Sequence, residues 1–135
     1  MNRAQEAEVR RLGGDPTDAT WRWLVLEGPH GASFSWGQTR GHPAGFVSVE
    51  LLQRIADERE VDDPSFPGRA RAVVNSALES HAADFVRRAI QVAAVVGGRD
   101  EARRVKALAT HANASVAADA RASAFYLRGR LARRG

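Results

Sequence analysis

The sequence contains two similar stretches thirty residues apart, ALESHAADFV at residues 77–86 and ALATHANASV at residues 107–116. Both place Ala-Leu ahead of a His-Ala pair, and both end in a valine five residues after the histidine. A recurrence at a fixed spacing of roughly 20–50 residues is typical of stacked helical hairpins. We therefore predict two such units in the second half of the chain. Units of this kind present a surface to partners more often than they hold reacting groups.

The apolar pattern around the two stretches predicts four helices. Their expected positions are residues 69–80, residues 85–96, a segment that begins at Asp100, and residues 116–131. Apolar side chains recur there at the three- and four-residue intervals of one helix face. Breaks are expected near residues 81–84, at Gly97-Gly98 and near residues 113–115. The expected N-caps, whose side chains accept amide hydrogen bonds, are Asp84, Asp100, and either Asn113 or Ser115.

The first half shows a different pattern. Residues 21–27 (WRWLVLE) are aromatic and β-branched in character, and residues 32–36 (ASFSW) alternate strictly between apolar and polar side chains. The two segments flank a Gly/Pro turn, which predicts a β-hairpin. In this hairpin Ala32, Phe34 and Trp36 would face a core. A two-stranded hairpin is marginal alone, so we expect it to pack on the helices or to pair with a third strand near residues 45–47.

Helices are expected on both sides of this hairpin. Residues 3–12 predict a short helix that ends at Gly13-Gly14, and residues 49–60 predict another with Ser48 as its N-cap. The alternative for the first strand is a helix from Pro16 to Leu26 with Asp15 as its N-cap.

Residues 93–127 (AAVVGGRDEARRVKALATHANASVAADARASAFYL) resemble a HEAT-type repeat of the short, roughly thirty-residue kind. Gly98 and Asp100 match the turn before the first helix, and Val116 opens the second helix as in that family. Residues 69–96 fit the same scheme, whereas Ala117 stands where the family usually has Arg. The resemblance, over residues 69–131, implies a binding role by analogy. The alternative is a plain helical bundle.

Together these patterns predict a fold that is mainly α with a small β-hairpin (α+β). Its C-terminal helical hairpins would pack as a short α-solenoid or helix bundle. The expected organisation is an N-terminal helix or arm, a β-hairpin plus helix, and a helical-pair region with a basic C-terminal helix, all in one compact unit, at residues 1–14, 15–61 and 69–135.

Charge is distributed unevenly along the chain. The net charge is +4, but residues 99–135 carry nine cations against three acids, a balance of +6. Such asymmetry can mark an anionic partner or serve only solubility. Cysteine is absent from the sequence, which excludes disulfides and thiol chemistry. Apolar runs are much shorter than the roughly 20 residues of a membrane helix, and no signal core opens the chain, so we expect a cytoplasmic protein.

Two surfaces are candidates for binding. The first gathers the three tryptophans with a loop, since Trp and Arg are enriched at binding centres; it consists of Trp21, Trp23, Trp36, Arg40 and His42. A strand over 21–27 would be apolar on both faces, leaving one for a partner. The second could grip phosphates and consists of Arg121, Arg128, Arg130, Arg133 and Arg134.

The histidines give weaker signals for chemistry. His81 and His111 occupy matched positions, where a ring donor near a helix end would satisfy carbonyl groups. His30, Arg40 and His42 lie in Gly-rich loops but show no spacing of a known catalytic arrangement. We expect no enzyme, no metal and no cofactor. The leading hypothesis is a protein-binding adaptor whose partner is another protein, and the alternative is nucleic-acid binding.

Overall fold

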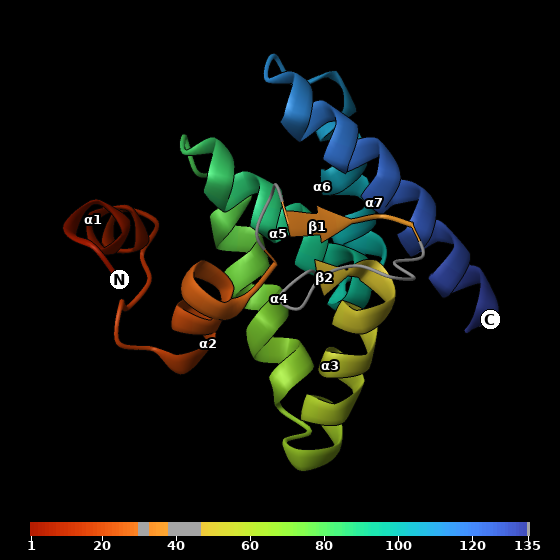
Figure 1. The fold of residues 1–135 in the computed structure, drawn as a ribbon, viewed down its shortest axis with the longest axis horizontal. Coiled ribbons are helices and arrows are strands. Elements are labelled where there is room, and N and C mark those ends of the chain that lie inside the picture. The colour runs from red at the N-terminus through yellow and green to blue at the C-terminus, as the bar shows by residue number, and fades with distance from the viewer. Residues whose placement is uncertain (30–32, 38–46, 135) are drawn as a thin grey trace.

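The computed structural model describes residues 1–29, 33–37 and 47–134. Its elements, in chain order, are α1 (Arg3–Arg11), α2 (Ala19–Arg22), the π-helical turn η1 (Trp23–Glu27), β1 (Phe34–Ser35), β2 (Val47–Ser48), α3 (Val49–Asp62), α4 (Phe66–Ala77), α5 (Ala83–Val96), α6 (Arg99–Ala107), the 3-10 turn η3 (Leu108–Thr110) and α7 (Ala114–Arg133). The fold is mainly α with a small β element, as the sequence predicts (Figure 1).

Residues 19–27 are helical, so the prediction of a strand at 21–27 is wrong. The Asp18 side chain accepts hydrogen bonds from the amides of Thr20 and Trp21, at 2.8 and 3.1 Å, and starts α2. Four of the five residues from 21 to 25 are apolar and buried, and such a short apolar run suits a buried helical turn as well as a strand. The alternative prediction, a helix from Pro16 to Leu26, is closer to the structure. Its proposed N-cap, Asp15, instead accepts hydrogen bonds from the amide and hydroxyl of Thr17.

The two strands are parallel rather than a hairpin. Phe34 pairs with Val47 and Ser35 with Ser48, in a sheet of two residues per strand. The third strand, expected near residues 45–47, is described at Val47–Ser48, where it pairs with part of the second predicted strand, while residues 45 and 46 lie outside the described residues. Parallel strands need a longer connection than a tight turn, which excludes a hairpin between them. Phe34 is buried and packs edge-on against Trp36, with ring centroids 4.9 Å apart, while Ala32 lies outside the described residues.

The helix caps follow the sequence at two ends and depart from it at two. Ser48 accepts from the Leu51 amide, and Asn113 accepts from the amides of Ser115 and Val116. The cap predictions at Asp84 and Asp100 are wrong, because the two helices begin earlier, after Ala82 and Gly98. At these ends Ser80 accepts from the Ala82 amide, and Glu101 accepts from the Gly98 amide.

The second half of the chain forms two helical pairs that stack side by side, α4 with α5 and α6 with α7. The chain bends between Leu78 and Ala82 and again between Leu108 and Asn113, as the recurring stretches predict. Helix α5 is central: it contacts α3, α4, α6, α7 and η1 (Figure 1). Fully buried alanines at positions 89, 93 and 120 allow α5 and α7 to approach closely.

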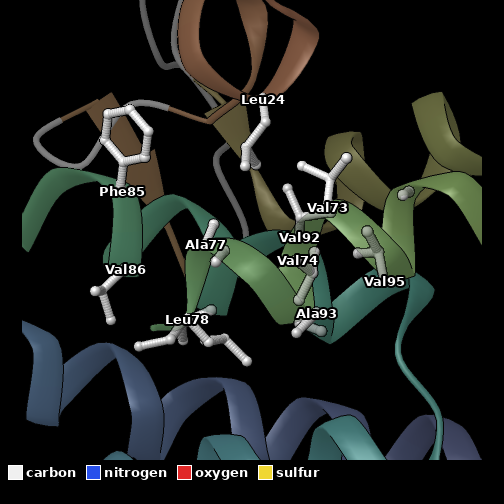
Figure 2. Packing of buried hydrophobic residues seen from close by; sticks show 14 of the residues in the cluster. Leu24, Val73, Val74, Ala77, Leu78, Phe85, Val86, Val92, Ala93 and Val95 are labelled. Carbon is white, nitrogen blue, oxygen red and sulfur yellow. The ribbon is translucent and has the colours of Figure 1, made fainter. Parts of the chain in front are cut away.

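One apolar core joins the two halves. Figure 2 shows Leu24 of η1 reaching toward Val73 of α4 and Val92 of α5. The N-terminal helix α1 joins the same core through Val9, which is 0% exposed, and its Glu8 accepts a hydrogen bond from Ser80. Gly13 has a φ of 83°, a conformation that glycine adopts without strain, and it ends α1 where the sequence predicts.

Candidate functional site

Two of the three tryptophans belong to the core. Trp21 and Trp23 are 5% and 6% exposed. The Trp23 ring packs edge-on against Phe66, with centroids 5.6 Å apart, and the Arg59 guanidinium lies over both rings. The expected apolar strand face therefore does not exist, and these rings offer a partner almost no surface. Their segment folds as a helix that buries both.

The rest of the expected tryptophan surface is divided. Trp36 is half-buried, and its indole Nε1 donates to Asp119 at 3.2 Å. Arg40 and His42 lie outside the described residues, as does His30. Of the five predicted partner-binding residues, the structure therefore describes Trp21, Trp23 and Trp36, of which two are buried and one is half-buried.

The five C-terminal arginines do not act as one set. Arg130 is 6% exposed, and its guanidinium donates to the carbonyls of Ala94, at 3.0 Å, and Gly97. It thus satisfies the carbonyl end of α5, where a cation also complements the helix dipole. Burial lowers the pKa of this guanidinium from its ordinary value. Of the five arginines predicted to bind phosphate, Arg130 is thus buried and bonded to backbone carbonyls, whereas the other four are exposed, at positions 121, 128, 133 and 134.

The matched histidines are both exposed, and one has a different role from that expected. The Nδ1 atom of His111 accepts the amide hydrogen of Asn113 at 2.9 Å. The ring therefore supports the turn before α7 as an acceptor and does not donate to helix carbonyls. Among the residues that the structure describes, no group of three or more His, Asp or Glu side chains could hold a metal ion.

A groove of about 470 Å³ lies between α6 and α7 and is the strongest candidate site. The α6 side and η3 contribute Ala102, Arg103, Lys106 and Ala109, and α7 contributes Arg121, Ala124, Phe125, Arg128 and Leu131. We call this surface the α6–α7 groove. The positions recur at three- and four-residue intervals and form one face of each helix. The inward faces, marked by Val105, Val116, Ala120 and Leu127, are buried in the stack.

The α6–α7 groove combines an apolar floor with cationic edges. Four of its nine lining residues are Arg or Lys, and none of the nine is acidic. Phe125 is 71% exposed, and the Arg128 guanidinium lies 5.6 Å from its ring centroid. Arg121 donates to the Ala109 carbonyl across the two walls at 3.1 Å. Arg103 pairs with Asp100, an exposed residue outside the lining.

A buried carboxylate fixes the α6 wall of the groove. Glu101 is 3% exposed and accepts from Arg71 Nε at 2.7 Å, Asn75 Nδ2 at 3.0 Å and the Gly98 amide at 2.8 Å. Burial alone would raise its pKa, but the hydrogen bonds from Asn75, Gly98 and Arg71 outweigh it and lower the pKa to about 2. The network ties α6 to α4, because Arg71 and Asn75 belong to α4.

A second buried carboxylate fixes the α7 wall. Asp119 accepts from Arg87 Nε at 2.7 Å, from Trp36 Nε1 at 3.2 Å and from Gln91 Nε2 at 3.3 Å. Two of these donors lie on α5, and Trp36 follows β1. The hydroxyl of Ser123 adds a 2.8 Å hydrogen bond to the Ile90 carbonyl. Both walls are therefore held by polar links to the inner helical pair, so the groove is rigidly placed.

Arg121 and Arg128 of the α6–α7 groove are among the residues predicted from the sequence, whereas Arg103, Lys106 and Phe125 are not. The signal lay in the helical register, because Phe125 falls outside the apolar stripe of Val116, Ala120, Ala124 and Leu127. A smaller cleft of about 300 Å³ lies on the other flank of Phe125, lined also by Trp36, Tyr126 and Arg133. Burial raises the pKa of Tyr126.

Comparisons of the chain with protein-family models, with curated proteins and with solved structures found no match. Among the described residues, none of the helices is both long enough and apolar enough to span a membrane.

Proposed function

We propose that the protein is a non-enzymatic adaptor module that binds another protein through its helical-pair region. The observation that carries this proposal is the α6–α7 groove, an apolar channel with an exposed phenylalanine on a rigid helical support. Aromatic residues, Phe included, and Arg are enriched at protein interfaces relative to the rest of the surface. A cytoplasmic location is part of the same proposal.

The stacking of the helices supports the HEAT-like interpretation of the sequence. Second helices α5 and α7 pack along each other, and the first helices α4 and α6 are joined through Glu101. In an array of this kind each unit buries the face of its neighbour, and the outer face of a terminal unit needs a cap or a partner. None of the residues that line the α6–α7 groove belongs to α4 or α5.

Nucleic-acid binding is the second candidate, and the exposed cations of α6 and α7 favour it. Arg103, Lys106, Arg121 and Arg128 line one groove, and Arg133 and Arg134 extend the charge toward the C-terminus. Neutralising several phosphates would make binding fall steeply with salt concentration. Burial of Arg130 removes one cation from this set, and phosphates would leave the apolar floor unfilled. We therefore rank this function below protein binding.

The test is capture followed by reconstitution. The immobilised full chain is incubated with a nuclease-treated extract of the cells that produce it, and the retained proteins are identified by mass spectrometry. A defined partner should then form a complex with the purified chain, measured by isothermal titration calorimetry. Capture of no protein, together with binding of the purified chain to duplex or single-stranded DNA that decreases steeply with salt, would support the second candidate instead.

A further inference from the structure

The chemistry of the α6–α7 groove identifies a class of partner. We propose that the groove binds an acidic amphipathic helix of another protein, laid between α6 and α7 with its apolar face on the floor and carboxylates along both flanks. This inference rests on the proposed protein-binding function and specifies its site.

The shape of the groove fits a helix. Three of its nine lining residues are half-buried alanines, Ala102, Ala109 and Ala124. Small side chains let a helix backbone approach closely, as they do inside the stack, where Ala120 of α7 is fully buried next to α5. The α7 wall runs from Arg121 to Leu131, about 15 Å at the helical rise, which covers about ten residues of a bound helix. Helices that dock in such grooves use apolar side chains at intervals of three and four residues.

The charge of the groove selects an acidic partner. Cations stand on both walls, Arg103 and Lys106 on α6 and Arg121 and Arg128 on α7, and none of the lining residues is acidic. A helix between them would therefore gain from glutamate or aspartate on each side of its apolar stripe. The same cations repel a basic helix, which adds specificity. Phe125, 71% exposed with Arg128 over its ring, is the expected anchor between the two rows of charge.

A display library tests the chemistry without a known partner. Its peptides are about 16 residues long, enough to cover the groove, and each position is drawn equally from Ala, Leu, Gln, Glu and Lys. These residues are all good helix formers, so charge and apolar spacing alone are selected. Peptides selected on the full chain should carry leucine at helical spacing and an excess of glutamate over lysine beside it.

Groove variants then locate the binding. In the K106E/R128E chain, both altered side chains are exposed, and we expect the affinity of the best peptide, measured by fluorescence anisotropy, to decrease at least about tenfold. Phe125→Ala, which changes one exposed ring and no charge, should also weaken binding. The matched control R3E/R54E makes the same change in net charge at exposed positions outside the groove and should change affinity by less than about twofold. Circular dichroism verifies that each variant is folded.

Several results would overturn the inference. A library that yields no binder, binders without a glutamate excess, or peptides that bind K106E/R128E as tightly as the original chain would each do so. A molecular mass that rises with protein concentration in the original chain and is lower in K106E/R128E would assign the groove to a second copy of the chain. The α3 helix of that copy is acidic and carries Val61, which is 82% exposed. Displacement of the peptide by DNA would assign it to nucleic acid.

The proposed function and this inference fail separately. A natural partner that binds K106E/R128E undiminished leaves the adaptor function in place and removes the acidic helix from the groove. Selected acidic peptides that bind the groove, together with an extract that yields no protein partner, keep the acidic-helix site in place and count against the adaptor function.

Discussion

Glu101 and Asp119 are the buried carboxylates that link the two helical pairs. Each accepts three hydrogen bonds, and each has an arginine of the inner pair as one donor, Arg71 or Arg87. A buried carboxylate is tolerated only when donors replace its lost hydration. Both residues therefore act in placing α6 and α7, and through them the α6–α7 groove, rather than in contacting a partner.

Glu101→Gln should destabilise the protein at neutral pH. The variant keeps the side-chain shape but replaces a charged acceptor, and hydrogen bonds to a charged group contribute about 1.5–3 kcal/mol, so we expect the free energy of unfolding to decrease by about 2 kcal/mol. Urea denaturation at pH 7 measures this. Asp100→Asn, at the exposed neighbouring residue, is the control and should change stability by less than about 0.5 kcal/mol.

The pH dependence of this effect follows from the pKa of Glu101, which lies at about 2 in the folded protein against an ordinary value of 4.5. Since the unfolded chain binds the proton more tightly, the stabilising contribution is complete above the unfolded pKa and is lost as the pH falls toward the folded one. The difference in stability between the original chain and Glu101→Gln should therefore shrink between about pH 5 and pH 2. A difference independent of pH would mean that the carboxylate charge is not what stabilises the network.

At the scale of elements, the sequence predicts secondary structure best where its local signals, such as a cap residue and an apolar stripe, agree. Helix α7 combines an Asn113 cap with an apolar stripe, so its existence was predictable, although it begins at Ala114, two residues before the predicted start. The segment 19–27 was not, because its apolar side chains suit a strand as well as a helix, and burial of Trp21 and Trp23 decided between them. Arg128 and Arg130 differ by two positions, or roughly 200° around a helix, so only the packing shows which one faces the groove.

Two cap candidates at the start of α7 can be separated by mutation. Asn113→Ala removes the acceptor for two amides, at 2.9 and 3.1 Å, and should lower the free energy of unfolding by about 1 kcal/mol. Ser115→Ala should change it by less than about 0.5 kcal/mol, because Ser115 lies inside the helix and is exposed. Thermal or urea denaturation measures both. Equal losses from the two variants would contradict Asn113 as the cap.

At the scale of the whole molecule, charged residues and buried residues are both distributed unevenly. Residues 49–63, which contain α3, hold six acids and two arginines, whereas residues 99–135 carry a balance of +6. Opposite charge on different parts of a small protein orients an approaching partner and raises the rate of association. The candidate groove lies at the basic part, so binding of an acidic partner should be faster at low salt.

Packing centred on α5 predicts a gradient of stability across the molecule. Nine of its fourteen residues are buried, whereas α1 buries Val9 alone among its nine. Amide hydrogens of α5 should therefore exchange only through global unfolding, and those of α1 through local opening at a lower free energy. Native-state hydrogen exchange in increasing urea measures this, and the α1 amides should show little dependence on urea. If α1 and α5 exchanged with one common free energy and one common urea dependence, α1 would be an integral part of the cooperative core, held by more than Val9 and the bond between Glu8 and Ser80.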